Sequence, residues 1–366
     1  MMTAENKPEH LYIHVPFCRT ICFYCDFCHV VYTEELADRW LDALTIEAER
    51  LRDVKNLKTI YIGGGTPNSL SDFQLRRLLD LFAHIQCEEY TVEINPESLD
   101  QEKAEILRDH GVNRISMGMQ SSDPEELKMM NRHHTMEDLR NAVNLLRQAG
   151  IENISLDLMY SLPGQTMRIL KKSLEDAVSL EPAHISIYSL TIEENSVFGR
   201  RGYTTADEDT EADMYEWICK VLPAYGYEQY EISNFAQKGK ESRHNLAYWH
   251  YRDFYGFSAG ASGKEGHLRY DKPRNLKAYI ADPFTREEIP LTREEERFEH
   301  WMMSLRMVQG MDLEEFRERY GISFTECYPE ITHSLIQRGL LECDGKYLRC
   351  TKQGYPIMNE ILEEYL

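Results

Sequence analysis

The chain has 366 residues, enough for one large domain and a small one, and its hydrophobic content of 42% is ordinary for a globular protein. Its formal net charge of −21 argues against nucleic-acid binding, because contacts with phosphate groups require clustered Lys and Arg. The apolar runs are too short for a transmembrane helix. The nine cysteines do not form a disulfide framework, so we expect a protein of the reducing cytoplasm.

Short β-rich runs alternate with helical stretches over the first two thirds of the chain. This alternation predicts an α/β fold with a parallel sheet and helices outside it, although it does not show whether the sheet closes into a barrel. The predicted strands are 11–15, 59–62, 91–94, 114–117, 154–159 and 185–190, and the predicted helices are 33–54, 72–82, 101–109, 136–148, 167–180 and 207–224.

Composition divides the chain into three parts, with a predicted core at 1–225. Residues 226–288 are rich in Gly, Tyr, Phe, Ser and Asn, and we expect an irregular segment there. Residues 289–366 predict a winged-helix-like module with helices at 292–307, 312–320 and 325–338, a hairpin turning at Asp344-Gly345, and a final helix.

Three closely spaced cysteines, Cys18, Cys22 and Cys25, have the spacing C-x3-C-x2-C. Thiolates so arranged can hold an iron–sulfur cluster. Three ligands for four irons would leave one iron open, as in a catalytic metal site. A structural zinc site is the alternative, with Cys28 or His29 as the fourth ligand.

Further motifs follow the predicted strands. The glycines of Gly63–Pro67 allow close approach to a ligand, although a tight turn that binds nothing would also use them. Glu93, Gln120 and Asp157 lie in or at the ends of successive strands, where ligands bind in such folds. Each alone could be a structural polar group, but together they predict a polar cup, and Arg132 suits a carboxylate there.

The cysteine turn, with Tyr24 before the third cysteine, resembles the radical S-adenosylmethionine (radical SAM) superfamily. The order of GGGTP, VEINPES, MGMQS and LDLMYSLPGQT is similar to the oxygen-independent coproporphyrinogen III oxidase branch. The resemblance implies a partial (β/α)6 barrel and a [4Fe–4S] cluster on the three cysteines, with SAM bound to the open iron. The SAM contacts that it implies are Tyr12, Tyr24, Gly64, Gly65, Thr66, Glu93, Gln120, Arg132 and Asp157.

Two features separate the chain from the oxidase. Phe27 stands where the oxidase has a further cysteine, and His244-Asn-Leu-Ala-Tyr-Trp249 matches the HNxxYW signature of the HemW group of heme chaperones. This resemblance implies heme binding and transfer to an acceptor protein, without coproporphyrinogen decarboxylation.

His244 offers an axial ligand whose ordinary pKa is near 6.5, and Tyr248 and Trp249 offer flat faces for a porphyrin. A histidine packed beside aromatic rings, without a ligand, is the plainer interpretation of the same motif. For the whole chain, the rival functions are the oxidative decarboxylation itself and a zinc-stabilised interaction protein.

Overall fold

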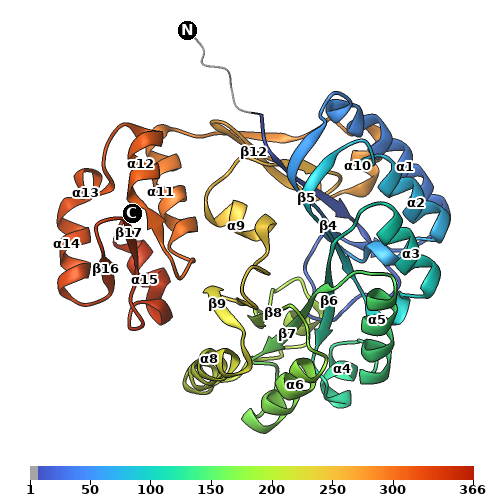
Figure 1. Cartoon of the computed structure of the whole chain (residues 1–366), viewed down its shortest axis with the longest axis horizontal. Helices are drawn as coiled ribbons and strands as arrows, with labels where there is room; N and C mark the ends of the chain where they lie inside the picture. The colour runs from blue at the N-terminus through green and yellow to red at the C-terminus, as the bar shows by residue number, and fades with distance from the viewer. Residues whose placement is uncertain (1–6) are drawn as a thin grey trace.

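The computed structural model describes residues 7–366 and centres on a nine-stranded sheet (Figure 1). The strand order is β11-β1-β4-β5-β6-β7-β8-β10-β9. The six predicted strands are confirmed as β1 (His10–Val15), β4 (Asn56–Gly64), β5 (Gln86–Ile94), β6 (Arg114–Gln120), β7 (Asn153–Tyr160) and β8 (His184–Ser189). All neighbours among these six are parallel. Because β11 and β9 lie at opposite ends of the order, the sheet is an open, partial barrel.

The predicted helices cover the outer side of this sheet (Figure 1). They are α1 (Glu34–Ala48), α2 (Asp72–Asp80), α3 (Gln101–Asp109), α5 (Met136–Gln148), α6 (Met167–Ser179) and α8 (Glu208–Val221), with the short α4 (Pro124–Met129) and α7 (Val197–Arg200) between them. Side-chain caps begin the helices: Ser71 and Thr135 form capping boxes with Gln74 and Asp138.

Alternate residues of each strand face opposite sides of the sheet. One set is apolar and packs beneath the helices, as Ile60, Ile115 and Leu156 do. The other set is largely polar and faces the inside of the barrel, as Ser116 and Asp157 do. The sheet therefore has an apolar outer face, which the helices cover, and a largely polar inner face.

The segment expected to be irregular instead extends the same sheet. β9 (Glu228–Glu231) and β10 (Asn234–Ala236) add antiparallel strands beside β8, and β11 (Tyr255–Phe257) adds a parallel strand beside β1. Between them, α9 (Arg243–Trp249) carries the HNxxYW residues and lies in the opening of the barrel (Figure 1). A small sheet follows, made of β12 (Ser262–Glu265), β13 (Leu268–Asp271) and β14 (Glu287–Pro290), with α10 (Leu276–Ala281) before β14.

The carboxyl-terminal module has its own core, which includes Trp301, Phe316 and Leu348. Its elements are α11 (Arg293–Ser304), β15 (Met311–Asp312), α12 (Leu313–Tyr320), α13 (Phe324–Cys327), α14 (Pro329–Gln337), β16 (Leu341–Cys343), β17 (Tyr347–Cys350) and α15 (Met358–Glu363). The predicted helix 325–338 is divided, because Pro329 keeps Tyr328 out of helical conformation. The predicted hairpin is confirmed as β16 and β17.

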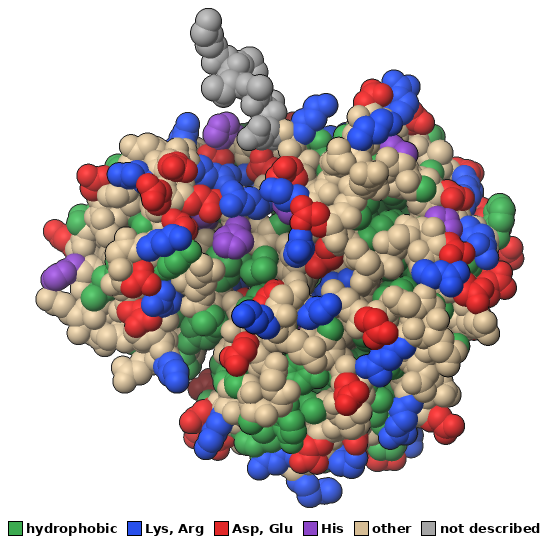
Figure 2. Space-filling view, in the orientation of Figure 1, with side chains coloured by type: hydrophobic (Ala, Val, Ile, Leu, Met, Phe, Trp, Pro, Cys, Tyr) green, Lys and Arg blue, Asp and Glu red, His purple; other side chains and the backbone are tan. Residues whose placement is uncertain are grey.

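Acidic and basic side chains are interspersed over the face shown in Figure 2. Within residues 7–366, none of the helices combines the length and the apolar character that crossing a membrane would require.

Candidate functional site

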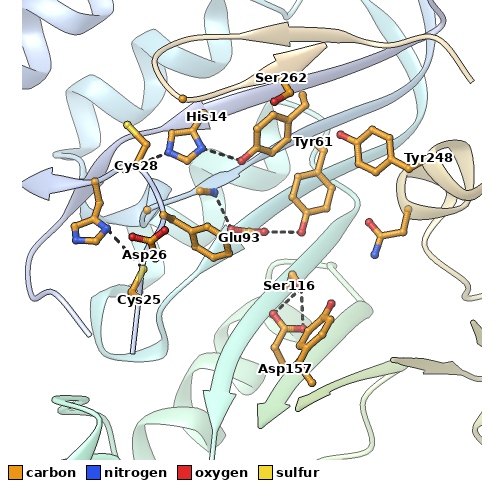
Figure 3. Close-up of a pocket in the computed structure, with 18 of the residues that line it drawn as sticks. His14, Cys25, Asp26, Cys28, Tyr61, Glu93, Ser116, Asp157, Tyr248 and Ser262 are labelled. Carbon is orange, nitrogen blue, oxygen red and sulfur yellow. Dashed lines mark hydrogen bonds between the residues drawn. The ribbon is translucent and has the colours of Figure 1, made fainter. Parts of the chain in front are cut away.

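One cavity of about 1150 Å³ opens at the carboxyl ends of the barrel strands (Figure 3). Its lining includes the cysteine turn at one end, the polar inner face of the strands, and residues of α9, β12, β13 and α11. The structure brings all the predicted cluster and SAM residues to this cavity: Tyr12, Cys18, Cys22, Tyr24, Cys25, Gly64, Gly65, Thr66, Glu93, Gln120, Arg132 and Asp157. His244 is not among the lining residues.

The three cysteines of the turn are free thiols. Burial raises the pKa of the Cys18 thiol to about 11 and that of the Cys25 thiol to about 12. Both thiols are therefore neutral near pH 7, and binding of a metal would release their protons.

Each of these sulfurs has one hydrogen-bonding side chain beside it. Thr66 Oγ1 lies 3.6 Å from Cys18 Sγ, Arg132 Nη1 lies 3.8 Å from Cys22 Sγ, and His29 Nδ1 lies 3.6 Å from Cys25 Sγ. Hydrogen bonds to sulfur help to set the reduction potential of an iron–sulfur cluster. The surroundings of the three thiols thus suit thiolates that carry a cluster.

Cys28 is directed elsewhere. Its thiol donates to the carbonyl of Arg274 at 3.0 Å, and Figure 3 shows it beside His14, apart from Cys25. Within residues 7–366, no three His, Cys, Asp or Glu side chains are grouped as ligands of a single metal ion. A structural zinc site needs such a compact set. The thiol of Cys28 is thus engaged with Arg274 instead of completing a set of four ligands with the other three cysteines.

The glycine loop is held tightly against its neighbours. A Cβ atom on Gly63 would lie 2.7 Å from Cδ of Glu93, and one on Gly64 would lie 2.3 Å from the ring of His14. Gly64 also has a φ of +106°, which side chains rarely tolerate. Packing inside the protein is thus sufficient to require these glycines, while Gly64 and Gly65 still present backbone to the cavity.

Glu93 is fixed by two hydrogen bonds. The phenol of Tyr61 donates to Oε1 at 2.7 Å, and the backbone N–H of Gly64 donates to Oε2 at 2.9 Å (Figure 3). Burial raises the pKa of the Glu93 carboxyl. The side chain is therefore held in one orientation at the cavity wall, where it can accept a further bond from a ligand.

Arg132 crosses the mouth of the barrel in a buried position. Its Nη1 donates to Oδ1 of Asn95 at 3.0 Å, and its Nη2 donates to the carbonyl of Gly118. Its Nε is buried and has no hydrogen-bond partner among residues 7–366. Gln120 lies nearby at a β-bulge of β6, where its φ of +62° re-aims its side chain. Together they offer donors for a carboxylate.

Asp157 receives hydrogen bonds from the hydroxyl of Ser116, at 3.1 Å to Oδ1 and 2.9 Å to Oδ2 (Figure 3). Burial raises the pKa of the Asp157 carboxyl.

Tyr12 is hydrogen-bonded through its phenol to Nδ1 of His14 at 2.9 Å, and burial raises the pKa of Tyr12 and Tyr24 well above 10. Both phenols are therefore neutral.

His244 lies behind the cavity wall and is 1% exposed. Its Nδ1 is 2.6 Å from Oγ1 of Thr59, and its Nε2 is 2.7 Å from the phenol oxygen of Tyr248. Burial lowers the pKa of His244 well below 6.5, so the expectation that it titrates near neutral pH is wrong. Iron coordination by His244 would require one of the two hydrogen bonds to break, and this arrangement gives the predicted axial role no support.

The two aromatic residues of the same motif separate. Tyr248 lines the cavity, whereas Trp249 packs beneath the guanidinium of Arg306 at 5.7 Å and accepts a hydrogen bond from Ser304 on its carbonyl at 3.2 Å. Trp249 thus joins the barrel to the carboxyl-terminal module. It does not offer the porphyrin-facing surface that the sequence suggested.

The site residues that sequence reasoning missed include His14, Asn95 and Arg114, which line the cavity. The spacing by two along each strand signals His14, two after Tyr12, and Arg114, two before Ser116. His134 is buried, and its Nε2 lies 3.0 Å from the carbonyl of Met119.

Comparisons with known proteins agree with this geometry. A model of the Radical SAM superfamily matches residues 12–177, and one of the HemN C-terminal domain matches residues 291–357. The heme chaperone HemW of Lactococcus lactis is 40% identical, with 99% of this chain and 98% of the relative covered. That of Bacillus subtilis is 38% identical, with 97% and 98% covered.

A solved structure supports the fold over the full length. Coproporphyrinogen III oxidase (HemN) from Escherichia coli, described as a radical SAM enzyme, has a TM-score of 0.85 and 23% identity, covering 98% of this chain and 91% of that one. The HemW of Escherichia coli is 34% identical, with 99% of both chains covered. The chain therefore belongs to the radical SAM superfamily and, within it, to the family of the heme chaperone HemW.

Proposed function

We propose that this chain is a heme chaperone, which binds heme and transfers it to an acceptor protein while carrying a [4Fe–4S] cluster and SAM. Full-length similarity to proteins named heme chaperone HemW carries the proposal. The cavity supports it: at about 1150 Å³ it exceeds the usual range of 300–1,000 Å³ for one small ligand, so it has space for SAM and a second ligand.

The cluster and SAM belong at the cysteine end of the cavity. Cys18, Cys22 and Cys25 would hold the cluster, whose open iron supplies a coordination site for SAM. Glu93 and Arg132 would orient SAM through fixed polar atoms. The nine free thiols also support a reducing, cytoplasmic setting for such a site.

Heme belongs at the other end, between the barrel and the carboxyl-terminal module. Tyr248 of α9, Ile289 of β14, and Met302 and Met303 of α11 line this end. Aromatic, aliphatic and thioether side chains suit the flat apolar face of a porphyrin, and thioethers also ligate heme iron.

Anaerobic reconstitution tests the proposal. We expect iron and sulfide at four each per chain, saturable heme binding, and transfer of that heme to apomyoglobin as an acceptor probe. The control is the Cys18→Ala/Cys22→Ala/Cys25→Ala triple variant, which should take up no cluster. Absence of saturable heme binding by the reconstituted parent would overturn the proposal.

Coproporphyrinogen III decarboxylation is the second candidate, favoured by the likeness of the fold to HemN. Phe27, which is 69% exposed, occupies the position of the extra cysteine of that enzyme type and offers no ligand or thiol chemistry. We therefore expect no protoporphyrinogen IX from the reconstituted protein with SAM and a reductant. Turnover at about one per second, an ordinary enzyme rate, would establish the second candidate instead.

A further inference from the structure

Arg114 is a buried cation on the inner face of the barrel. It begins β6, is 2% exposed, and lines the cavity. Its Nε is buried and has no hydrogen-bond partner in the described part of the chain. A buried charge is costly unless it is paired and hydrogen-bonded, so a guanidinium in this state calls for a ligand.

Two acidic groups whose charges act on Arg114, Glu89 and Asp157, are already engaged. Glu89 accepts the backbone N–H groups of Arg243 and His244, at 2.9 and 3.0 Å, and so caps the start of α9. Asp157 accepts the hydroxyl of Ser116. Burial lowers the pKa of Arg114, but the charges of Glu89 and Asp157 outweigh it and keep the pKa raised. These carboxyls thus stabilise the charge without taking up the donors of the guanidinium.

Arg114 and Arg132 both line the cavity but come from different elements of the fold. Arg114 and Gln120 lie six positions apart at the two ends of β6, which is roughly 20 Å of extended strand. Arg132 contacts Gly118 and Cys22 at the mouth. The two side chains therefore enter the cavity from different positions, Arg114 from the start of β6 and Arg132 beside the carbonyl of Gly118.

Further polar groups line the cavity from the barrel opening. Tyr248 and Asn245 come from α9, and Tyr61 comes from β4; Figure 3 shows Tyr61 and Tyr248 extending into the cavity. The hydrogen bond between His244 and Tyr248 fixes the phenol of Tyr248 in place. Because the phenol of Tyr61 already donates to Glu93, the guanidinium of Arg114 and the amide of Asn245 are the donors available to recognise a carboxylate.

We propose that Arg114 anchors a carboxylate-binding subsite in the barrel interior, and that its occupant is a propionate side chain of a tetrapyrrole. The choice of a tetrapyrrole rests on the proposed function, whereas the carboxylate subsite rests on Arg114 and its surroundings. Guanidinium and carboxylate would form a bidentate pair, which would orient the tetrapyrrole as well as hold it.

The test compares heme with heme dimethyl ester, in which both propionates are esterified. The parent should bind heme roughly 10- to 100-fold more tightly than the ester, the range expected for a charge-assisted hydrogen bond. Arg114→Met should bind the two equally. Arg50→Met is the matched control, because Arg50 is paired with Glu265 outside the cavity, and it should keep the preference.

Equal binding of heme and its ester by the parent would overturn the proposal, as would a preference that survives in Arg114→Met. Weaker SAM binding in Arg114→Met with the heme preference intact would assign the subsite to the carboxylate of SAM and also overturn it.

Parent protein that binds neither heme nor its ester would reject the proposed function, and sodium propionate then tests the subsite alone. For the parent, the unfolding temperature in sodium propionate should be higher than in the same concentration of sodium chloride. For Arg114→Met, the unfolding temperatures in the two salts should be equal. An equal effect of the two salts on the parent would reject the subsite too. If Arg114→Met does not fold, the measurements on the parent protein still test the proposal.

Discussion

The imidazole of His244 supports the phenol of Tyr248 from behind the cavity wall, with 2.7 Å between Nε2 and the phenol oxygen. The other ring nitrogen meets Thr59, whose hydroxyl also lies 2.9 Å from Nδ1 of His10. This buried chain of hydrogen bonds fixes α9 against the barrel, and it makes His244 a positioning residue for Tyr248.

We therefore expect His244→Ala to lower the free energy of unfolding by roughly 1–3 kcal/mol, because it leaves buried polar partners unsatisfied. The Soret band of bound heme should keep the position found in the parent. The matched control is His133→Ala, since His133 is exposed. A Soret shift confined to His244→Ala would restore the axial role predicted from the sequence.

Cys25 and Cys28 should differ in their effect on the metal content. Cys25→Ala removes a thiol beside the other two cluster ligands, so reconstituted protein should lose most of its iron and sulfide. Cys28→Ala removes only a bond to the carbonyl of Arg274 and should keep both. Iron, sulfide and zinc analyses of anaerobically purified protein decide the matter, and stoichiometric zinc without sulfide would contradict the cluster.

Thr66→Val should lower the reduction potential of the cluster. The hydroxyl of Thr66 lies 3.6 Å from Cys18 Sγ, and a donor to sulfur stabilises the more negative, reduced cluster. A loss of about 1 kcal/mol of this preference corresponds to roughly 40 mV for a one-electron couple. Redox titration followed by electron paramagnetic resonance measures it. Thr45→Val, remote from the cavity, should leave the potential unchanged.

Glu93→Gln should weaken SAM binding by roughly 10- to 100-fold while leaving the iron content unchanged. The change keeps the shape of the side chain but removes the charge that Tyr61 and Gly64 hold in place. Calorimetric titration of reconstituted protein with SAM is the measurement. Glu126→Gln alters another buried carboxyl outside the cavity lining, and a similar weakening in that variant would refute a specific role for Glu93.

Glu231 should make stability depend on pH at the joint between the barrel and the carboxyl-terminal module. It is buried next to Ile232, whose N–H donates to the carbonyl of Arg306 at 3.1 Å. Burial raises the pKa of Glu231 from 4.5 to about 7. The folded state thus holds this proton more tightly than the unfolded state does. The stability that protonated Glu231 adds to the folded state is complete below about pH 4.5 and is lost as the pH rises to about 7.

The loss amounts to roughly 3 kcal/mol over that interval. Glu231→Gln should remove this pH dependence and be more stable than the parent at pH 8, as measured by urea unfolding at several pH values. Glu228→Gln changes an exposed residue of the same strand and should behave as the parent does. Parallel pH profiles for the parent and Glu231→Gln would show that Glu231 does not titrate in this range.

Local pattern was sufficient for the regular part of the fold. Helices α3 and α5 begin and end at the predicted residues, because the residues that cap them and the spacing of their apolar residues lie close together in the sequence. β9, β10 and β11 were missed, since strands of three or four residues are too short to show a period. β11 exists through its pairing with β1, more than 200 residues away in the chain.

In the functional site, too, some features could be predicted from local sequence and others could not. Residues that lie in recognisable motifs, such as Cys18 and Glu93, reach the cavity as expected. The burial of His244 and the direction of the Cys28 thiol depend on contacts with distant residues, Thr59 and Arg274. No spacing within a motif encodes such contacts, so sequence identified the residues but not which way they face.

The short helix α9 connects the strands that end the sheet on its two sides. β10, with β9, ends the β8 side, and β11 ends the β1 side. The gap between them is thus crossed by a connecting segment instead of a ladder of strand pairs. Asn245 and Tyr248 of α9 therefore line the cavity from a segment whose position depends on side-chain contacts, those of Glu89 with the start of the helix and of Thr59 with His244, instead of on strand pairing.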